Sequence, residues 1–221
     1  AIGNFAFRNC TALESITIPD TVTKIGWNAF DGCTSLASVK LSEKLKTIPS
    51  NAFQGCSSLA SIKLPQNLND ICTDAFSGSG LESVTIPASC TTIDNYAFAK
   101  CKNLATVTFE QGVKKIGSYC FKGCTALENI TIPDTVESIG SYAFYDCDTL
   151  RKVVIPNSVT NISARVFSGC TGLTNVTLGN SVTNIGNFAF SDCTGLASIA
   201  FPSSVTSIGW NAFKSVSSVY T

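Results

Sequence analysis

A phenylalanine recurs along the chain at almost constant spacing, and this repetition constrains the fold more than any other feature. It occupies positions 7, 30, 53, 76, 98, 121, 144, 167, 190 and 213, so the step is 23 residues and is 22 only once. The unit around it reads roughly L-x-x-I-x-I-P-x-x-V-x-x-I-G-x-x-A-F-x-x-C-x-x. A unit this short cannot close a hydrophobic core alone, so successive units must stack into a solenoid.

The spacing within one unit predicts its local structure. Ile16 and Ile18 alternate with polar residues, which is the two-residue period of a short strand with one buried face. Pro19 lacks a backbone donor and ends that strand. Between Val22 and Cys33 the apolar residues are spaced by three or four, which favours an irregular or single-turn helical segment facing inward. A tight bend is expected at the Gly of the I-G pair, at positions 26, 117, 140, 186 and 209.

Stacking these units predicts an α/β-type solenoid that forms a single domain over residues 1–221, with about ten coils. Nine strands would form one parallel sheet with about 4.8 Å per rung, so the solenoid would be about 40 Å long. The chain contains no Met and opens inside a unit. We therefore expect it to be a segment of a longer protein.

The run IPxxVxxIGxxAFxxC resembles the BspA-like (Treponema pallidum type) class of leucine-rich repeat, and the resemblance covers essentially the whole chain. It implies a right-handed superhelix of 22–23-residue coils with the parallel sheet on the concave face. It also implies a cell-surface or secreted protein that is linked to adhesion and to the binding of host proteins.

Composition excludes several functions. Lys plus Arg and Asp plus Glu number 15 each, so no net field would attract nucleic acid. No apolar run approaches the roughly 20 residues that cross a bilayer, so no membrane insertion is expected. There is no His for a Ser-His-Asp triad, no pair of carboxylates at a fixed spacing and no phosphate-binding glycine loop. The sequence therefore predicts a protein that is not an enzyme and needs no cofactor.

The chain has 11 Cys, and eight of them lie three residues after the repeated Phe, at positions 10, 33, 56, 101, 124, 147, 170 and 193. A disulfide ladder is one interpretation, but parallel side chains one rung apart hold their Cβ atoms too far apart, and the runs are odd in number. A metal site is disfavoured because CxxC pairs and His are absent. A nucleophile is disfavoured because no His could serve as its base. A column of small, buried, reduced thiols is the favoured interpretation.

Outward strand positions vary from unit to unit, and they are the first candidate for a partner-binding surface. We call them the strand face. They are Ser15, Thr17, Ser38, Lys40, Ser61, Lys63, Ser83, Thr85, Thr106, Thr108, Asn129, Thr131, Lys152, Asn175 and Thr177. The alternative is a solvated sheet face rich in Thr because Thr favours strands.

A stripe of aromatic residues two positions before the Phe, with Trp beside it, is the second candidate. Its members are Trp27, Tyr96, Tyr119, Tyr142, Phe188 and Trp210. Partly exposed aromatic side chains on successive coils can anchor a protein or glycan. The alternative is packing between neighbouring coils.

These observations favour a non-catalytic adhesion module that binds a host-surface protein, an extracellular-matrix protein or a glycan through its concave sheet. The rival hypothesis is a structural spacer or assembly segment of a larger surface protein. Open ends of the solenoid would permit end-to-end self-association in that case.

Overall fold

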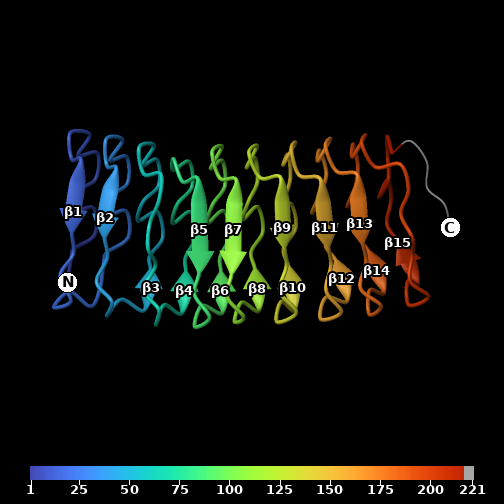
Figure 1. The fold of residues 1–221 in the computed structure, drawn as a ribbon, viewed down its shortest axis with the longest axis horizontal. Helices are drawn as coiled ribbons and strands as arrows, with labels where there is room; N and C mark the ends of the chain where they lie inside the picture. The colour runs from blue at the N-terminus through green and yellow to red at the C-terminus, as the bar shows by residue number, and fades with distance from the viewer. Residues whose placement is uncertain (217–221) are drawn as a thin grey trace.

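The fold is a parallel β-solenoid, as the repeat predicts. The structure, a computed structural model, describes residues 1–216, so the last five residues of the predicted solenoid lie outside it. Figure 1 shows the coils side by side in one row from the N-terminus to the C-terminus. Between Leu13 and Leu196 the chain makes eight complete turns with partial coils at both ends, so the predicted count of about ten is slightly too high.

The predicted strands form the first of two series. Equivalent positions of neighbouring units pair in parallel, for example Ile16 with Val39 and Val153 with Val176. Residues 61–63 and 198–200, predicted as strands, have no strand assignment. The strands of this series are β1 (Ser15–Thr17), β2 (Ser38–Lys40), β5 (Ser83–Ile86), β7 (Thr106–Phe109), β9 (Asn129–Thr131), β11 (Lys152–Val154) and β13 (Asn175–Thr177).

A second series of two-residue strands lies where an irregular or helical segment was predicted, so the expectation of one sheet is incomplete. Their second residue is an Ile that is buried in all but the last strand. They are β3 (Thr47–Ile48), β4 (Asp70–Ile71), β6 (Thr92–Ile93), β8 (Lys115–Ile116), β10 (Ser138–Ile139), β12 (Asn161–Ile162), β14 (Asn184–Ile185) and β15 (Ser207–Ile208). The pairing of the two series is interrupted, which divides them into five sheets.

The helical part of the α/β expectation is wrong, because residues 1–216 contain no helix. Alternate backbone donors around the repeated Phe bond to the next coil, whereas those between them bond three residues back along their own chain. The N–H of Phe53, for example, donates to the carbonyl of Ala75 at 2.8 Å, and the N–H of Phe121 donates to that of Ala143 at 2.7 Å. A helix needs these donors for its own turns, so bonding between coils excludes it.

The repeated Phe side chains form the centre of the core. Ring centroids of successive coils lie 5.1 to 5.5 Å apart, from Phe7 at one end to Phe213 at the other. The planes of neighbouring rings differ by no more than 13°. The eight Phe from Phe30 to Phe190 are fully buried. Since each ring packs on two others, the stack ties every coil to its neighbours.

The Gly residues of the I-G pairs were predicted to permit a tight bend, but the structure gives them a different role. Gly117 and Gly140 do not have positive φ; a Cβ on Gly117 would meet the backbone of Asp94 in the preceding coil. These Gly are needed for close approach. The left-handed conformation instead occurs two residues before and two residues after each Phe. We call the first of these positions the left-handed column, and it holds Phe5, Asn28, Asn51, Asp74, Tyr96, Tyr119, Tyr142, Arg165, Phe188 and Asn211.

Candidate partner-binding surfaces

Every predicted strand-face residue is exposed, from Ser15 to Thr177, because inward and outward side chains alternate as the pattern requires. The hydroxyl and Lys side chains therefore face solvent. Shallow hollows lie along this face. One, of about 250 Å³, is lined in part by Lys63, Ser83 and Thr85. A second, of about 250 Å³, lies against Thr177 and Ala200.

Three Tyr of the left-handed column form a stack at the surface, in which Tyr96 is exposed and Tyr119 and Tyr142 are half-buried. The ring centroids of Tyr96 and Tyr119 are 4.6 Å apart with planes at 3°, and those of Tyr119 and Tyr142 are 4.5 Å apart with planes at 12°. Their faces cover one another, so ring edges and hydroxyls are presented to solvent. Desolvation raises the pKa of Tyr119, and the neighbouring Tyr142 and Tyr96 raise it further.

Two cationic side chains extend this stack toward the C-terminus. Lys122 Nζ lies 5.6 Å from the ring centroid of Tyr119 and 5.4 Å from that of Tyr145. The guanidinium of Arg165 lies 5.6 Å from the Tyr142 ring and 4.1 Å from the Phe188 ring. Both are cation–π distances. Phe188 in turn meets Trp210 edge to face at 4.9 Å.

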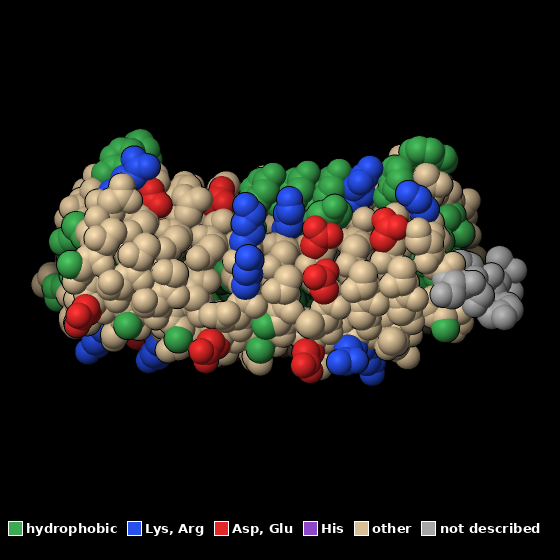
Figure 2. Space-filling view, turned by 90° about the horizontal axis from the view of Figure 1, so that it is seen from above, with side chains coloured by type: hydrophobic (Ala, Val, Ile, Leu, Met, Phe, Trp, Pro, Cys, Tyr) green, Lys and Arg blue, Asp and Glu red, His purple; other side chains and the backbone are tan. Residues whose placement is uncertain are grey.

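These contacts join one continuous surface, which we call the aromatic ridge: Tyr96, Tyr119, Lys122, Tyr142, Tyr145, Arg165, Phe188 and Trp210. The indole of Trp210 is 69% exposed. Figure 2 shows hydrophobic side chains gathered along one edge of the molecule with Lys and Arg among them. Sequence reasoning missed Lys122, Tyr145 and Arg165, although the repeat register places Arg165 in the same column as the Tyr.

Trp27, predicted as part of the same stripe, lies in a separate group near the N-terminal end. Its ring meets Phe5 edge to face at 4.3 Å, and the guanidinium of Arg8 lies 5.4 Å from the Phe5 ring. Arg8 also forms an ion pair with Asp31 at 2.9 Å. The column positions between this group and Tyr96 carry Asn or Asp, so the stripe is interrupted.

The left-handed column holds several residues in a backbone conformation that is energetically unfavourable for them. A left-handed backbone costs most residues about 1–2 kcal/mol, and Asn and Asp tolerate it best. Four coils use Asn or Asp there, at positions 28, 51, 74 and 211. The other six carry aromatic rings or Arg165, with φ near 58°. Bulky residues therefore occupy positions where the backbone alone would favour Asn.

The Cys column is structural. Each thiol donates to the carbonyl of the Phe one coil earlier, at 3.0 to 3.2 Å; the pairs are Cys33 with Phe7, Cys56 with Phe30, Cys101 with Phe76, Cys124 with Phe98, Cys147 with Phe121, Cys170 with Phe144 and Cys193 with Phe167. Cys10, in the first coil described, is exposed. Ser79 replaces Cys in one unit and its hydroxyl meets the Cys101 sulfur at 3.3 Å.

Burial makes these thiols unreactive. Desolvation raises the pKa of Cys56, Cys147 and Cys193 from 9.0 to about 12 each. A nucleophilic Cys needs the opposite shift. Within residues 1–216 no group of three or more His, Cys, Asp or Glu side chains is placed to hold a metal ion. The thiols thus fill space and satisfy carbonyls.

The fold and the repeat define a leucine-rich solenoid, and the chain belongs to the family with the BspA-type leucine-rich repeat region, whose model matches six copies over residues 1–105 and 91–220. Proteins of this family and fold are typically non-catalytic interaction modules. No curated protein matches the sequence.

Two solved structures are similar over nearly the whole chain. A leucine-rich repeat protein from Bacteroides ovatus is 25% identical with a TM-score of 0.60, over 97% of this chain and 80% of that one. A leucine-rich cell surface protein from Faecalibacterium prausnitzii is 27% identical with a TM-score of 0.54, over 99% of this chain and 82% of that one. Among residues 1–216 there is no apolar helix of the length that a bilayer span requires.

Proposed function

We propose that the chain is a non-catalytic module of a cell-surface or secreted protein and that it binds a host-surface or extracellular-matrix protein through the aromatic ridge. The observation that carries this proposal is the set of bulky residues in the left-handed column. Backbone conformations that cost energy are kept where side chains are needed for recognition. Tyr119, Tyr142 and Arg165 fill positions that other coils give to Asn or Asp.

The composition of the ridge fits a protein partner better than a glycan. Tyr, Trp and Arg dominate the energetic centres of protein interfaces. The ridge combines these three residue types with Phe188. A sugar ring stacks on a free aromatic face, but the faces of Tyr119 are covered by Tyr96 and Tyr142. Exposed ring edges and phenol hydroxyls instead suit a polypeptide, which offers both apolar groups and carbonyl acceptors.

The strand face is the second candidate surface. Its support is the unbroken exposure of its outward residues together with the hollows at Lys63 and Thr177. Its mainly uncharged hydroxyl side chains carry few of the residue types that anchor interfaces. We therefore assign it a supporting role beside the ridge.

Binding to a panel of purified extracellular-matrix and host-surface proteins tests the proposal. The ridge variant changes Tyr96, Tyr119 and Tyr142 to Asn, the residue that other coils carry in this column. We expect it to lose at least about 2 kcal/mol of binding free energy, roughly a 30-fold weaker affinity, because each Tyr of an interface centre contributes strongly. Surface plasmon resonance measures the change.

The matched control changes Lys40, Lys63, Thr85 and Thr108 of the strand face to Glu. We expect this variant to keep most of its affinity. If the strand-face variant loses binding and the ridge variant retains it, the contact surface is the strand face. If the wild-type chain binds no protein of the panel but joins copies of itself end to end, the spacer hypothesis replaces the proposal.

A further inference from the structure

The guanidinium of Arg165 lies inside the stack of the left-handed column. Successive coils place Tyr142, Arg165 and Phe188 at the same repeat position. The guanidinium carbon lies 5.6 Å from the centroid of the Tyr142 ring and 4.1 Å from that of the Phe188 ring. A guanidinium is planar and packs with its flat side on aromatic faces. The two rings therefore restrict the orientation of this group, and its N–H donors lie around its edge.

These donors have no partner among residues 1–216, because the Arg165 side chain forms no hydrogen bond and no ion pair there. Both carboxylate oxygens of Asp192 accept hydrogen bonds, from Ser191 and Ser215 at 2.8 Å each. These bonds lower the pKa of Asp192, and the charge of Arg165 contributes less. Arg165 is half-buried, so its guanidinium has lost part of its hydration without a carboxylate in return.

Arg8 shows which group a guanidinium packed on a ring binds in this protein. Its guanidinium lies 5.4 Å from the centroid of the Phe5 ring, and its Nε donates to Oδ2 of Asp31 at 2.9 Å. Asp31 has the same repeat position as Arg8, one coil further on. One coil after Arg165 that position holds Phe188. A carboxylate for Arg165 therefore has to come from another molecule.

We propose that Arg165 anchors the protein partner by binding the carboxylate of an Asp or Glu side chain in an acidic segment. This inference rests on the proposed function, because it names the partner chemistry of the same aromatic ridge. A carboxylate is planar and accepts two parallel N–H bonds from a guanidinium. It can approach in the plane of the Arg165 group without displacing Tyr142 or Phe188. Because the rings orient the guanidinium before binding, little conformational entropy is lost.

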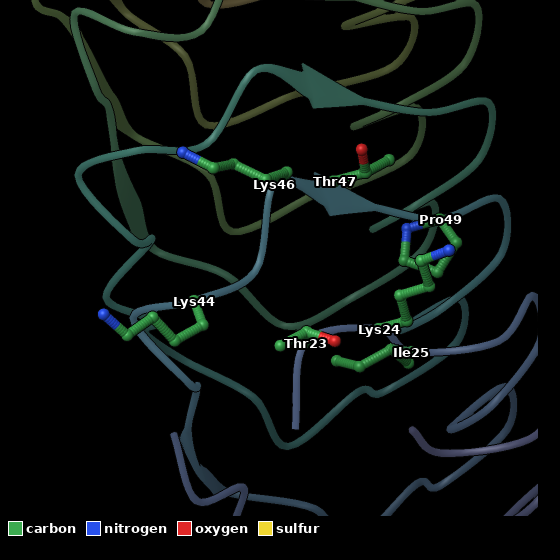
Figure 3. A pocket seen from close by; sticks show the side chains of 7 residues that line it. All are labelled: Thr23, Lys24, Ile25, Lys44, Lys46, Thr47 and Pro49. Atoms are coloured by element: carbon green, nitrogen blue, oxygen red, sulfur yellow. The ribbon is translucent and has the colours of Figure 1, made fainter. Parts of the chain in front are cut away.

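The Lys residues near the N-terminal end lack this arrangement. A cavity of about 390 Å³ is lined by Lys24, Lys44 and Lys46 together with uncharged residues. Figure 3 shows Lys24 beside Pro49 at one end of the cavity, whereas Lys44 and Lys46 extend from the other end. The lining contains no aromatic ring to orient the ammonium groups. This cluster therefore serves as a control for attraction by charge alone.

The probe is a short fluorescent peptide of alternating Thr and Glu, titrated into the chain, and its anisotropy gives the affinity. NMR spectra of the isotope-labelled chain locate the contact. The sequence contains three Arg, so the Nε–H signal of Arg165 is identified by its loss in Arg165→Lys. We expect this signal to shift saturably with the peptide, whereas the signal of Arg8, which already binds Asp31, stays in place. A peptide with Gln in place of Glu should bind at least about tenfold more weakly.

Two variants separate the guanidinium from charge in general. Arg165→Lys keeps the charge but loses the pair of parallel donors, so the affinity for the Thr-Glu peptide should fall about tenfold. Lys44→Gln with Lys46→Gln removes two charges elsewhere and should leave that affinity within about twofold. The inference is overturned if Arg165→Lys binds like the wild type, or if the double Lys variant loses as much affinity as Arg165→Lys. It is also overturned if inorganic sulfate shifts the Arg165 signal at a lower concentration than the peptide, since the ligand would then be a tetrahedral anion.

The panel of purified proteins separates this inference from the proposed function. If a protein of the panel loses affinity for the ridge variant but not for Arg165→Lys, the ridge binds that protein and the inference about Arg165 fails. If no protein of the panel binds the wild-type chain, the proposed function fails, and the peptide titration alone decides whether Arg165 binds a carboxylate.

Discussion

Replacing Phe121 by Ala is expected to lower the free energy of unfolding by about 3–5 kcal/mol, the usual cost of removing a buried aromatic ring. Phe121 is fully buried and stacks on Phe98 at 5.4 Å and on Phe144 at 5.3 Å. The cavity lies between coils, so it weakens the contact that holds the two halves of the array together. Urea denaturation followed by circular dichroism measures the loss.

Leu at position 121 is the matched control, because it keeps most of the volume and loses only the ring stacking. We expect Phe121→Leu to cost about 1 kcal/mol. An Ala variant as stable as the wild type would contradict a core held by the Phe stack.

Raising the pH above about 9 is expected to unfold the protein in a steep transition, because the buried thiols must ionise. Their folded pKa lies above the unfolded value: burial raises it from 9.0 to about 12 for Cys90 and to about 11 for Cys101. The unfolded chain therefore binds fewer protons in this range, and stability falls as pH rises. The stabilisation that the protonated thiols provide is fully present below pH 9. At pH 10 each such thiol costs about 1 kcal/mol, and several share the core.

A pH series of urea denaturation midpoints checks this prediction. Cys147→Ser is the control, because Ser79 already replaces Cys in one coil and its hydroxyl does not ionise in this range. The variant should show a shallower loss of stability between pH 9 and pH 11. A midpoint that stays constant up to pH 11 would contradict the column of buried, protonated thiols.

The sequence predicted the repeat architecture well, because the Phe and Leu spacing reports directly which side chains share a core. It failed at the segment around Ile25 and Ile48. Steps of three or four residues suit a helix and a folded-back coil equally, and bonding to the neighbouring coil decides between them. The role of Gly117 was also missed, since close approach between coils is invisible in one unit alone.

The sequence predicted which residues lie on the candidate surfaces, but it did not predict the contacts that join them. The repeat register placed Tyr96, Tyr119 and Tyr142 on successive coils, and the structure stacks them. The positive φ of their column could not be predicted, although the Asn and Asp that share it are a recognisable signal. Arg165 was overlooked because it interrupts an aromatic pattern while extending the same surface.

We propose that the stacked Tyr serve recognition and not folding. It is tested most directly by the urea denaturation midpoint of the variant in which Tyr96, Tyr119 and Tyr142 become Asn. Each Tyr–Tyr stack contributes about 0.5–1.5 kcal/mol to stability. Asn tolerates the left-handed backbone better than Tyr, so the substitution regains about as much. We expect a free energy of unfolding within about 1 kcal/mol of the wild type. A loss as large as that of Phe121→Ala would contradict it and make the stack part of the fold.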